Sequence, residues 1–327
     1  MSKPRTRIAG TGKAVPSKVL TNDDLAKTVE TSDEWINART GIRERRILEE
    51  GRTTSDLAAE AGLAACATAE IDPKELDCII CATISPDMPM PAVAVTVQQK
   101  MGATCAAFDI SAACAGFLYG MTIADGLIAG GGFKKVLVVG VEILSRVVDW
   151  TDRNTCVLFG DGAGAAVLVP STDERGILST HLFADGAGVP MLNIPGGGSA
   201  EPTTLRTVEA KRHLVKMQGK AVFTNAVKNI SRASQIALEA NGLEPKDIDV
   251  VVAHQANLRI LEAVAERVNI PIAKFYLNIM RYGNTSSASI PIALDEATRE
   301  GRIKPGDLLL LTALGAGLSW GSAVVRF

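Results

Sequence analysis

The sequence is poor in aromatic residues, in histidine and in net charge, and each shortage excludes a class of function. Aromatic side chains make up 4% of the 327 residues, three residues are histidines, and 34 basic residues nearly balance 36 acidic ones, for a net charge of −2. Because the charges are interspersed, the surface as a whole attracts neither nucleic acid nor an anionic membrane. So few histidines also disfavour a metal site built from imidazoles. We therefore expect no metal ion and no nucleic-acid partner.

Long apolar segments are missing as well. No run of apolar residues approaches the ~20 that cross a membrane, and the first residues, MSKPRTRIAGTGKAV, lack the apolar core of a secretory signal. We expect a cytoplasmic protein that does not interact with membranes. Hydrophobic residues at 47% against charged residues at 21% predict a globular chain with a large core.

The six cysteines are scattered through apolar segments, as is typical of a reducing compartment. Cys78 and Cys81 form a C-x-x-C pair inside the strand-like run CIICATI, without a second pair, which favours core packing over zinc binding. Cys114 differs, because it stands between a strand-like segment and an apolar helix. Free backbone N–H groups and the helix dipole at such a point lower the pKa of a thiol. Cys114 is a possible nucleophile, or else a small core side chain.

Two helix starts lie near the N-terminus. Thr21 caps a short helix, and residues 31–34 form a capping box in which Glu34 reaches back to the amide of Thr31. Trp35 and Arg39 are four residues apart on the second helix and therefore share a face. An aromatic ring beside a cation suits a flat anionic ligand such as a nucleotide, although an amphipathic surface helix would look the same.

Apolar runs and loops alternate through the rest of the first half. Residues 58–70 predict a helix, and residues 78–84 and 136–141 predict buried strands. Residues 85–91 contain three prolines and two methionines, which indicates a stiff loop at a wall or an interface. The glycines of residues 159–164 lack the order of a dinucleotide site and indicate a tight turn with close backbone approach. Residues 190–207 predict a long loop, either a boundary between halves or a mobile lid.

The second half repeats the first at an offset of 172 residues. Pro73 matches Pro245 within similar segments, Val136 matches Leu308 in two apolar runs, and Cys114 matches Ser286. We infer two duplicated halves, residues 1–172 and 173–327. Each alternates strands and helices and should form a mixed, mostly parallel sheet, with helices between the two sheets.

The duplication brings three reactive side chains to equivalent strand ends. His254 directly follows the run VVVA, and Asn284 stands just ahead of the helix entered at Ser286. Because reactive groups gather beyond the carboxyl ends of such strands, we expect Cys114, His254 and Asn284 to share one site. The alternatives are a structural histidine at a strand end and an asparagine that caps a helix.

Seven further motifs carry a resemblance that runs to the final WGSAVVRF. They are TSDEWI-x-x-RTGIRER, AACAGF, TDR-x-T, FGDGAGAAVL, HQANLRI, GNTS-x-AS and GRIKPGD. Together they are highly specific, and the chain resembles the β-ketoacyl-acyl-carrier-protein synthase III family of condensing enzymes. The resemblance implies an α/β thiolase-like fold of five layers, αβαβα, a homodimer, and a catalytic set of Cys114, His254 and Asn284.

The implied reaction is a decarboxylative Claisen condensation of an acyl-CoA starter with malonyl-acyl-carrier protein, which begins fatty-acid synthesis. Cys114 would attack the acyl-CoA and release CoA. His254 and Asn284 would stabilise the enolate that forms as carbon dioxide leaves, so that no cofactor is required. The amides of Cys114 and Ala316 would form the oxyanion hole of the acyl-transfer step.

The resemblance also assigns binding residues. Arg259 falls on a family position near the approach of the carrier protein. With Arg267, eight residues further along the same helix, it would offer a positive patch to an acidic carrier protein, although a solvated helix face would look the same. Met90 and Leu158 would belong to the acyl pocket, and Met90, at a position where the family often has phenylalanine, would reach it across the dimer. Trp35 and Arg153 would hold the adenine between them. The residues assigned to CoA or its phosphopantetheine arm are Thr31, Trp35, Arg39, Arg153, Gly219, Phe223 and Asn257.

Two other functions remain open. Met90, and Ala316 in place of a common glycine, allow a specialised acyltransferase or condensing enzyme of secondary metabolism with a different acceptor. A subunit that binds CoA or an acyl group without catalysis is a third possibility, which the complete catalytic set disfavours.

Overall fold

Two mixed β-sheets form the frame of the molecule, which a computed structural model describes for residues 6–327. The first sheet has five strands in the order β1-β7-β6-β4-β5. Strand β7 is antiparallel to both of its neighbours, whereas β4 pairs in parallel with β5 and β6. The strands are β1 (Thr6–Ala14), β4 (Cys78–Ala82), β5 (Ala106–Ile110), β6 (Val136–Glu142) and β7 (Gly162–Pro170).

The second sheet repeats this arrangement with four strands in the order β11-β12-β13-β8. Strand β13 is antiparallel to both neighbours, and β11 and β12 are parallel. Each sheet thus has a single strand that runs against the others, which confirms the prediction of mixed, mostly parallel sheets. The strands are β8 (Gly176–Ala184), β11 (Val250–Ala253), β12 (Leu308–Gly315) and β13 (Ser319–Arg326).

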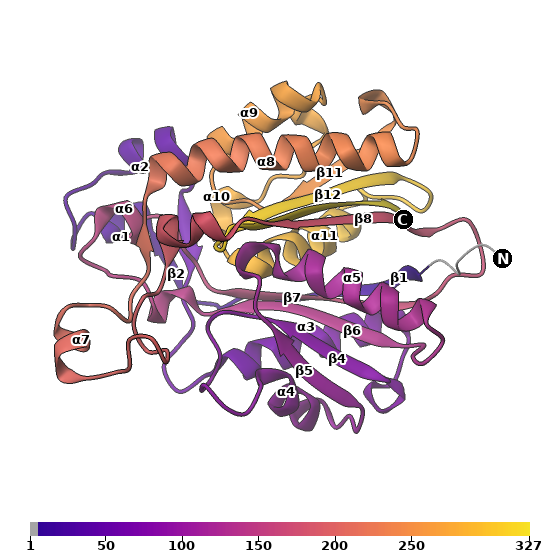
Figure 1. Cartoon of the computed structure of the whole chain (residues 1–327), viewed down its shortest axis with the longest axis horizontal. Helices are drawn as coiled ribbons and strands as arrows, with labels where there is room; N and C mark the ends of the chain where they lie inside the picture. The colour runs from indigo at the N-terminus through magenta and orange to yellow at the C-terminus, as the bar shows by residue number, and fades with distance from the viewer. Residues whose placement is uncertain (1–5) are drawn as a thin grey trace.

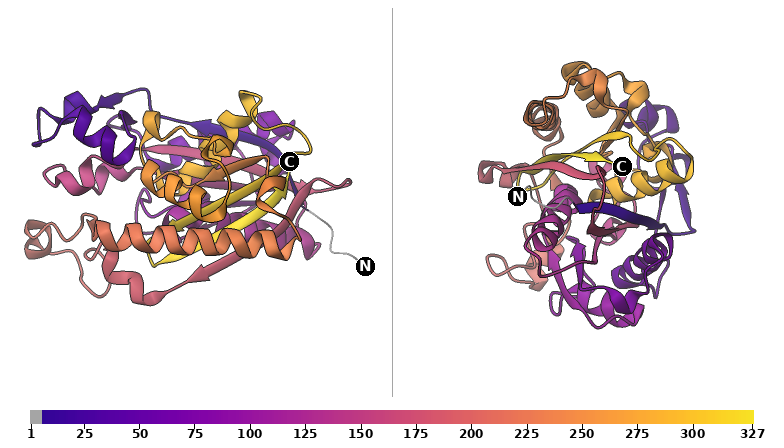
Figure 2. Two further views of the ribbon diagram at one scale, coloured as in Figure 1. Left: turned by 90° about the horizontal axis from the view of Figure 1, so that it is seen from above. Right: turned by 90° about the vertical axis from the view of Figure 1, so that its right-hand side faces the viewer.

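Helices fill the space between the sheets and cover both outer faces (Figure 1). Helices α5 and α11 lie between the sheets, α3 and α4 pack on the first sheet, and α8 and α9 pack on the second. Figure 2 shows the same layers from two other sides. The predicted αβαβα order is confirmed. The helices are α3 (Thr54–Ala69), α4 (Val93–Met101), α5 (Gly116–Ala129), α8 (Gly219–Ala240), α9 (Leu258–Val268) and α11 (Ser289–Arg299).

The middle layer gives the two halves a common core. Phe117 of α5 is fully buried in a cluster that contains Val138 of β6 and Leu311 of β12, one from each sheet. The halves therefore bury apolar surface against each other, and the central layer belongs to both.

The chain passes from the first sheet to the second between β7 and β8. We propose residues 1–172 and 173–327 as the two halves, since Pro170 ends β7 and Gly176 begins β8. The loop at residues 190–207 follows β8 and therefore lies inside the second half. Its interpretation as the boundary between the halves is wrong. It contains β9 (Leu192–Asn193) and leads into α7 (Leu205–Glu209).

The structure corrects one of the three sequence matches between the halves. Pro73 and Pro245 begin equivalent 3-10 helices, and Val136 and Leu308 begin β6 and β12, as an offset of 172 requires. Cys114, however, is equivalent to Ser287. The 3-10 helices η2 (Ala113–Ala115) and η7 (Ser286–Ala288) begin 173 residues apart, with a positive φ at the first residue of each, 45° and 48°. The runs of small residues around Cys114 and Ser286 match equally well at an offset of 172 or 173 residues, so the sequence alone does not reveal the shift of one residue.

Two helix starts differ from the prediction. Helix α1 (Asn22–Leu25) has Thr21 as its N-cap, as expected, but α2 (Asp33–Thr40) is capped by Ser32. The Ser32 hydroxyl accepts a hydrogen bond from the amide of Trp35 at 3.1 Å, so the box from Thr31 to Glu34 is wrong. Helix α3 starts four residues before position 58, because Thr53 and Asp56 form a capping box there.

Short elements gather at one end of the sheets, on the left in Figure 1. Within residues 6–327, none of the helices combines the length and apolar character needed to cross a membrane. The remaining short elements are β2 (Val19–Thr21), β3 (Glu44–Arg46), α6 (Arg153–Cys156), β10 (Lys216–Met217) and α10 (Ile279–Tyr282).

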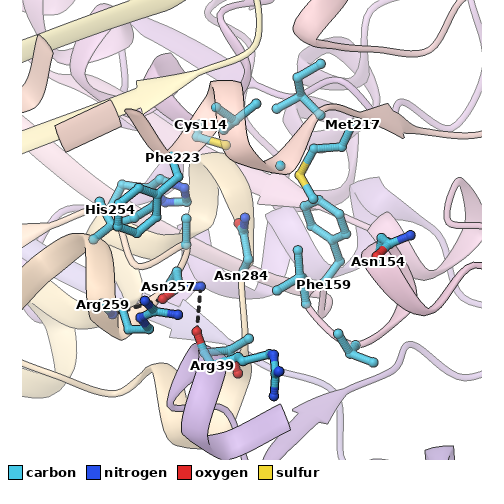
Figure 3. Close-up of a pocket in the computed structure, with 18 of the residues that line it drawn as sticks. Arg39, Cys114, Asn154, Phe159, Met217, Phe223, His254, Asn257, Arg259 and Asn284 are labelled. Carbon is cyan, nitrogen blue, oxygen red and sulfur yellow. Dashed lines mark hydrogen bonds between the residues drawn. The ribbon is translucent and has the colours of Figure 1, made fainter. Parts of the chain in front are cut away.

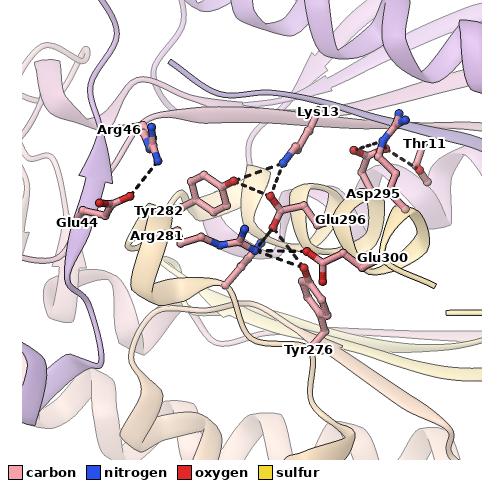
Figure 4. A network of polar contacts seen from close by, with 12 residues as sticks. Thr11, Lys13, Glu44, Arg46, Tyr276, Arg281, Tyr282, Asp295, Glu296 and Glu300 are labelled. Carbon is pink, nitrogen blue, oxygen red and sulfur yellow. Dashed lines mark hydrogen bonds and ion pairs between the residues drawn. The ribbon is translucent and has the colours of Figure 1, made fainter. Parts of the chain in front are cut away.

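A buried carboxylate ties β1 to α10 and α11 (Figure 4). Glu296 of α11 forms ion pairs with Lys13 and with Arg281, the latter at 2.9 Å. It also accepts hydrogen bonds from the Tyr282 hydroxyl at 2.5 Å and from the Asn278 amide at 2.9 Å. This network fixes the segment that leads into Asn284.

Candidate active site

Cys114 lies in the turn between a strand and a helix, as the sequence predicts. Strand β5 ends at Ile110, and η2 carries Cys114 directly into α5. Gly116 permits this approach, because a Cβ atom there would lie 2.8 Å from the Cβ atom of Ala82 in β4. The Cys114 residue is 8% exposed and lines two cavities, which favours the nucleophile over a core side chain.

The resting state of Cys114 differs from the prediction. Burial raises the pKa of the thiol to about 12, and the charge of Glu142 adds to the rise, while a hydrogen bond with Ser286 opposes it. The expected thiolate is therefore wrong for the free protein, because loss of solvent outweighs the helix N-terminus in this setting. Burial therefore keeps Cys114 as a thiol near neutral pH.

His254 follows β11 and enters the site as a neutral imidazole. Its amide donates to the carbonyl of Thr312 at 2.8 Å, which continues the ladder between β11 and β12. The ring is buried, and within the described part of the chain neither of its nitrogens has a hydrogen-bond partner. Burial lowers the pKa of His254 to about 4. A structural histidine would have its ring satisfied, so this unpaired ring is free to meet a ligand.

Asn284 combines a turn-stabilising role with a free donor. Its backbone amide donates to the carbonyl of Leu158 at 2.8 Å, and its Oδ1 accepts from the amide of Ser286 at 2.8 Å. Because the oxygen is occupied, the Nδ2 group remains to donate into the site. Thr285, and not Asn284, is the N-cap of η7, so the helix-capping interpretation of Asn284 is wrong, and the side chain stabilises the turn before that helix instead.

Cys114, His254 and Asn284 line one cavity of about 270 Å³, which we call the outer cavity (Figure 3). The three side chains come from η2, from the end of β11 and from the segment before η7, and they face the same space. The structure therefore brings together the three residues that the sequence predicts.

Most residues predicted to bind CoA also line the outer cavity. The guanidinium groups of Arg39 and Arg153 lie 4.4 and 4.7 Å from the centre of the Trp35 ring, so both contact the aromatic side chain. Thr31 is not among the lining residues, and Arg259 lines the cavity whereas Arg267 does not. The predicted residues that line it are Trp35, Arg39, Arg153, Gly219, Phe223 and Asn257.

A second cavity of about 220 Å³, the inner cavity, meets the outer one at Cys114. The two residues predicted for the acyl pocket do not line it. Leu158 lines the outer cavity, and Met90 is 83% exposed on the 85–91 loop, outside both cavities of this chain. The apolar residues that line it were missed, because they come from separate segments without a common motif: Ile84, Leu144, Phe159, Leu192, Ile194 and Val215.

The space beside the Cys114 amide depends on Gly315. A Cβ atom at Gly315 would lie 2.5 Å from the nitrogen of Cys114 and would fill the position that an oxyanion needs. Ala316 lines the inner cavity, and its φ lies outside the left-handed region that favours glycine. The alanine is therefore accommodated without strain.

Two further findings concern groups that could bind metal. Within residues 6–327, no group of three or more histidine, cysteine or acidic side chains is placed to hold a metal ion. Cys78 and Cys81 are fully buried in β4, where each belongs to an apolar cluster, so their prediction as core residues is confirmed.

Glu142 and Ser286 are functional candidates that the sequence reasoning missed. Glu142 ends β6 as a fully buried carboxyl group, and it accepts a hydrogen bond from Ser286, which lines the inner cavity together with Cys114. A usable signal existed, because a single acidic residue at the end of the apolar run VLVVGVE stands at a strand end, like His254.

Comparison with known proteins agrees with this geometry. Family models described as 3-oxoacyl-[acyl-carrier-protein] synthase III match residues 108–188 and, for its C-terminal part, residues 238–327. The β-ketoacyl-[acyl-carrier-protein] synthase III of Caldanaerobacter subterraneus is 51% identical over 321 residues, which cover 98% of this chain and 97% of that protein.

Solved structures agree at the level of the fold. The 3-oxoacyl-[acyl-carrier-protein] synthase III of Aquifex aeolicus is 47% identical, with a TM-score of 0.92 over 98% of this chain and 100% of that one. The priming β-ketosynthase of the R1128 polyketide pathway is 34% identical, with a TM-score of 0.90 over 100% and 98% of the two chains. By sequence, fold and the set of residues around Cys114, the chain belongs to the β-ketoacyl-acyl-carrier-protein synthase III family.

Proposed function

We propose that this protein condenses an acyl-CoA starter with malonyl-acyl-carrier protein, through an acyl group held on Cys114, and so begins fatty-acid synthesis. As a member of its family it is an acyl-transferring condensing enzyme. The observation that carries the proposal is the position of Cys114 where two cavities meet, with His254 and Asn284 on the outer side. The products are 3-oxoacyl-carrier protein, CoA and carbon dioxide.

Each catalytic side chain has a role that fits its chemistry. Cys114 attacks the thioester carbonyl, and its amide stabilises the oxyanion in the space that Gly315 leaves open. In the second step a neutral His254 and the Nδ2 group of Asn284 donate hydrogen bonds to the malonyl thioester oxygen as it becomes an enolate oxygen. The low pKa of His254 supports this donor role over a role as a base.

The outer cavity offers a binding site for the CoA arm. Arg39 and Arg153 bring positive charge to the Trp35 ring, which suits an adenine ring and phosphate groups. Asn257 is held in place by a hydrogen bond of 3.0 Å from its Nδ2 to the carbonyl of Arg39. Arg259 lines the mouth, and with Arg267 on the exposed face of α9 it would meet the acidic carrier protein.

The inner cavity suits the acyl chain, because aliphatic side chains and Phe159 form most of its wall. We further propose a homodimer, in which the exposed Met90 of one protomer reaches the acyl pocket of its partner. Decarboxylation drives the condensation, so the reaction needs no metal or redox cofactor. Six free cysteines support a location in the cytoplasm.

Mass spectrometry of the intact protein after exposure to a panel of acyl-CoAs tests the first step. We expect a mass increase equal to one acyl group for the preferred starters and none in the Cys114→Ala variant. An equal mass increase in that variant would place the acyl group elsewhere and contradict the proposal. Addition of malonyl-acyl-carrier protein should then discharge the acyl group with release of carbon dioxide.

A second candidate function is that of an acyltransferase or condensing enzyme of secondary metabolism that uses a different acceptor. It is supported by the similarity to the R1128 priming β-ketosynthase. The discharge experiment separates the two functions: rapid discharge by malonyl-acyl-carrier protein supports the first. An acyl-enzyme that this carrier leaves intact, and that other acceptors discharge, supports the second.

A further inference from the structure

The mechanism above leaves open which group takes the proton of Cys114. Burial holds the thiol in its protonated form, and thioester attack requires a thiolate. Among the described residues that line the two cavities, His254 is the other one able to accept a proton. With a pKa of about 4, however, it is a weak base near neutral pH.

Beneath Cys114, a buried carboxyl group is connected to the thiol through one hydroxyl. The Ser286 hydroxyl lies 3.2 Å from Oε1 of Glu142. Ser286 also lines the inner cavity together with Cys114, and its hydroxyl lowers the pKa of the thiol. Its amide orients Asn284, as described above. Ser286 therefore contacts two members of the catalytic set and Glu142 at once.

The two oxygens of Glu142 have different surroundings. Oε2 accepts hydrogen bonds from the Ser85 hydroxyl at 2.6 Å, from the Ile84 amide at 3.1 Å and from the Thr83 hydroxyl at 3.3 Å. Oε1 has the Ser286 hydroxyl at 3.2 Å and a longer contact of 3.3 Å with the same Ile84 amide. Oε1 is therefore the oxygen with room to receive a proton from the side of Cys114.

No cation of the described residues forms an ion pair with Glu142. The segment after β4 and η7 present only neutral hydroxyls and an amide, and the titratable group that interacts with the Glu142 charge is Cys114 on η2. Burial raises the pKa of Glu142 to about 7, so the group changes its protonation state near neutral pH. One negative charge can thus move between Glu142 and Cys114 without a second charge being buried.

We propose that Glu142 is a positioning residue that receives the Cys114 proton through the Ser286 hydroxyl. The S–H bond of Cys114 breaks, Ser286 takes that proton and passes its own to Oε1 of Glu142, and the products are a thiolate and a carboxylic acid. CoA then leaves as a thiolate and takes a proton from water. After condensation, Cys114 leaves the acyl group as a thiolate and recovers the stored proton from Glu142 by the same route.

The inference rests on the proposed function for its place in the cycle, but its test does not need an acyl-CoA. The rate of Cys114 alkylation by iodoacetamide is measured between pH 6 and 10, with peptide mapping to separate the other cysteines. In the unaltered protein the rate should rise through an inflection near pH 7, where Glu142 becomes able to accept a proton. Glu142→Gln should remove this inflection and lower the rate at pH 7.5 by about 100-fold, the scale of a lost general base.

Ser286→Ala should reproduce that profile, and the double variant should be no slower than either single variant, because both act on one route. At pH 10 all variants should approach the unaltered rate, since hydroxide then removes the proton; a merely misfolded site would stay slow. Ser287→Ala is the matched control, because its hydroxyl donates to the carbonyl of Ala82 at 2.8 Å instead.

Three outcomes would overturn the proposal. Glu142→Gln could keep the inflection and the rate, or it could react faster, which would mean that Glu142 only repels the thiolate. Ser286→Ala could leave the profile unchanged while Glu142→Gln alters it, which would exclude the relay. If alkylation follows the expected profile but acyl-CoA transfers no acyl group to Cys114, the relay stands and the proposed function fails.

Discussion

Two glutamates are buried among residues 6–327, and they differ in the charged groups around them. Glu296 is 4% exposed and pairs with Lys13 and Arg281, whereas Glu142 is fully buried among hydroxyls and an amide. Burial works to raise the pKa of Glu296, but the hydrogen bonds from Lys13, Tyr282 and Asn278 outweigh it and hold that pKa below its ordinary value. The pKa of Glu142 rises to about 7.

The difference shows that partners, more than burial, decide what a buried carboxyl group does. Glu296 keeps a fixed charge that joins β1 to α10 and α11, which is a structural task. Glu142 has no fixed charge near neutral pH and lies one hydroxyl away from a nucleophile. The first should matter for stability and the second for chemistry.

The largest expected effect on stability comes from replacing each glutamate by glutamine in a separate single variant. Glu296→Gln should lower the free energy of unfolding at pH 7.5 by about 3 kcal/mol, the low end for a broken buried ion pair, because Lys13 and Arg281 stay partly exposed. Glu142→Gln should cost less than about 1 kcal/mol at that pH, because it removes an unpaired buried charge. Urea unfolding measures both, and equal losses would break the comparison.

The pH dependence of stability should sharpen the comparison at Glu142. Its folded pKa of about 7 lies above the ordinary 4.5, so the folded protein keeps a proton that the unfolded chain loses, and stability falls as pH rises between these values. Between pH 5.5 and 7, the free energy of unfolding of the unaltered protein should fall by about 2 kcal/mol relative to that of Glu142→Gln. A difference that does not change with pH would show that Glu142 keeps one protonation state.

For Glu296 the sign is opposite. Its folded pKa is lowered, so its contribution is present above the ordinary pKa and is lost only as the pH falls through the folded value. The unfolding free energy of Glu296→Gln relative to the unaltered protein should therefore stay constant between pH 5.5 and 7. A change across that window comparable to that of Glu142→Gln would contradict the assignment of a fixed charge.

The smallest effects should come from the cations around Glu296. Lys13→Met should cost about 1 kcal/mol and Arg281→Met about 0.5 kcal/mol, because the Arg281 side chain is 42% exposed against 27% for Lys13. Thermal unfolding at two salt concentrations measures both losses of stability. Added salt should reduce the loss caused by Arg281→Met by a larger fraction than the loss caused by Lys13→Met. A larger loss at Arg281 would mean that exposure does not rank the two pairs.

Much of the fold was predictable because the duplication is visible in the sequence. The apolar runs that begin at Val136 and Leu308 lie at one offset, and they predict two equivalent strands. The register of Cys114 was not predictable, since the small residues around it and around Ser286 contain no side chain large enough to fix an alignment. A shared positive φ revealed it.

Site residues that belong to a local sequence pattern were predictable. Properties that depend on several segments of the chain packing together were not. His254 stands at the end of β11, as the pattern predicts, whereas Asn284 follows the short helix α10 and not a strand, so the expected strand end is wrong for Asn284. Both residues line the outer cavity. The sequence predicted a thiolate at Cys114, whereas burial raises the pKa of the thiol. The segments that bury Cys114 are distant in the sequence, so a local pattern does not reveal them. That Leu158 lines the outer cavity and not the inner one was unpredictable for the same reason.

The meeting of the two cavities at Cys114 has a consequence for inhibition. Under the proposed function, a compound that extends from the outer cavity past the sulfur into the inner one would occupy the space for the acyl group on Cys114. Such a compound would bind only the unloaded enzyme. It would compete with the acyl donor, and any starter that loads the enzyme in advance would protect against it.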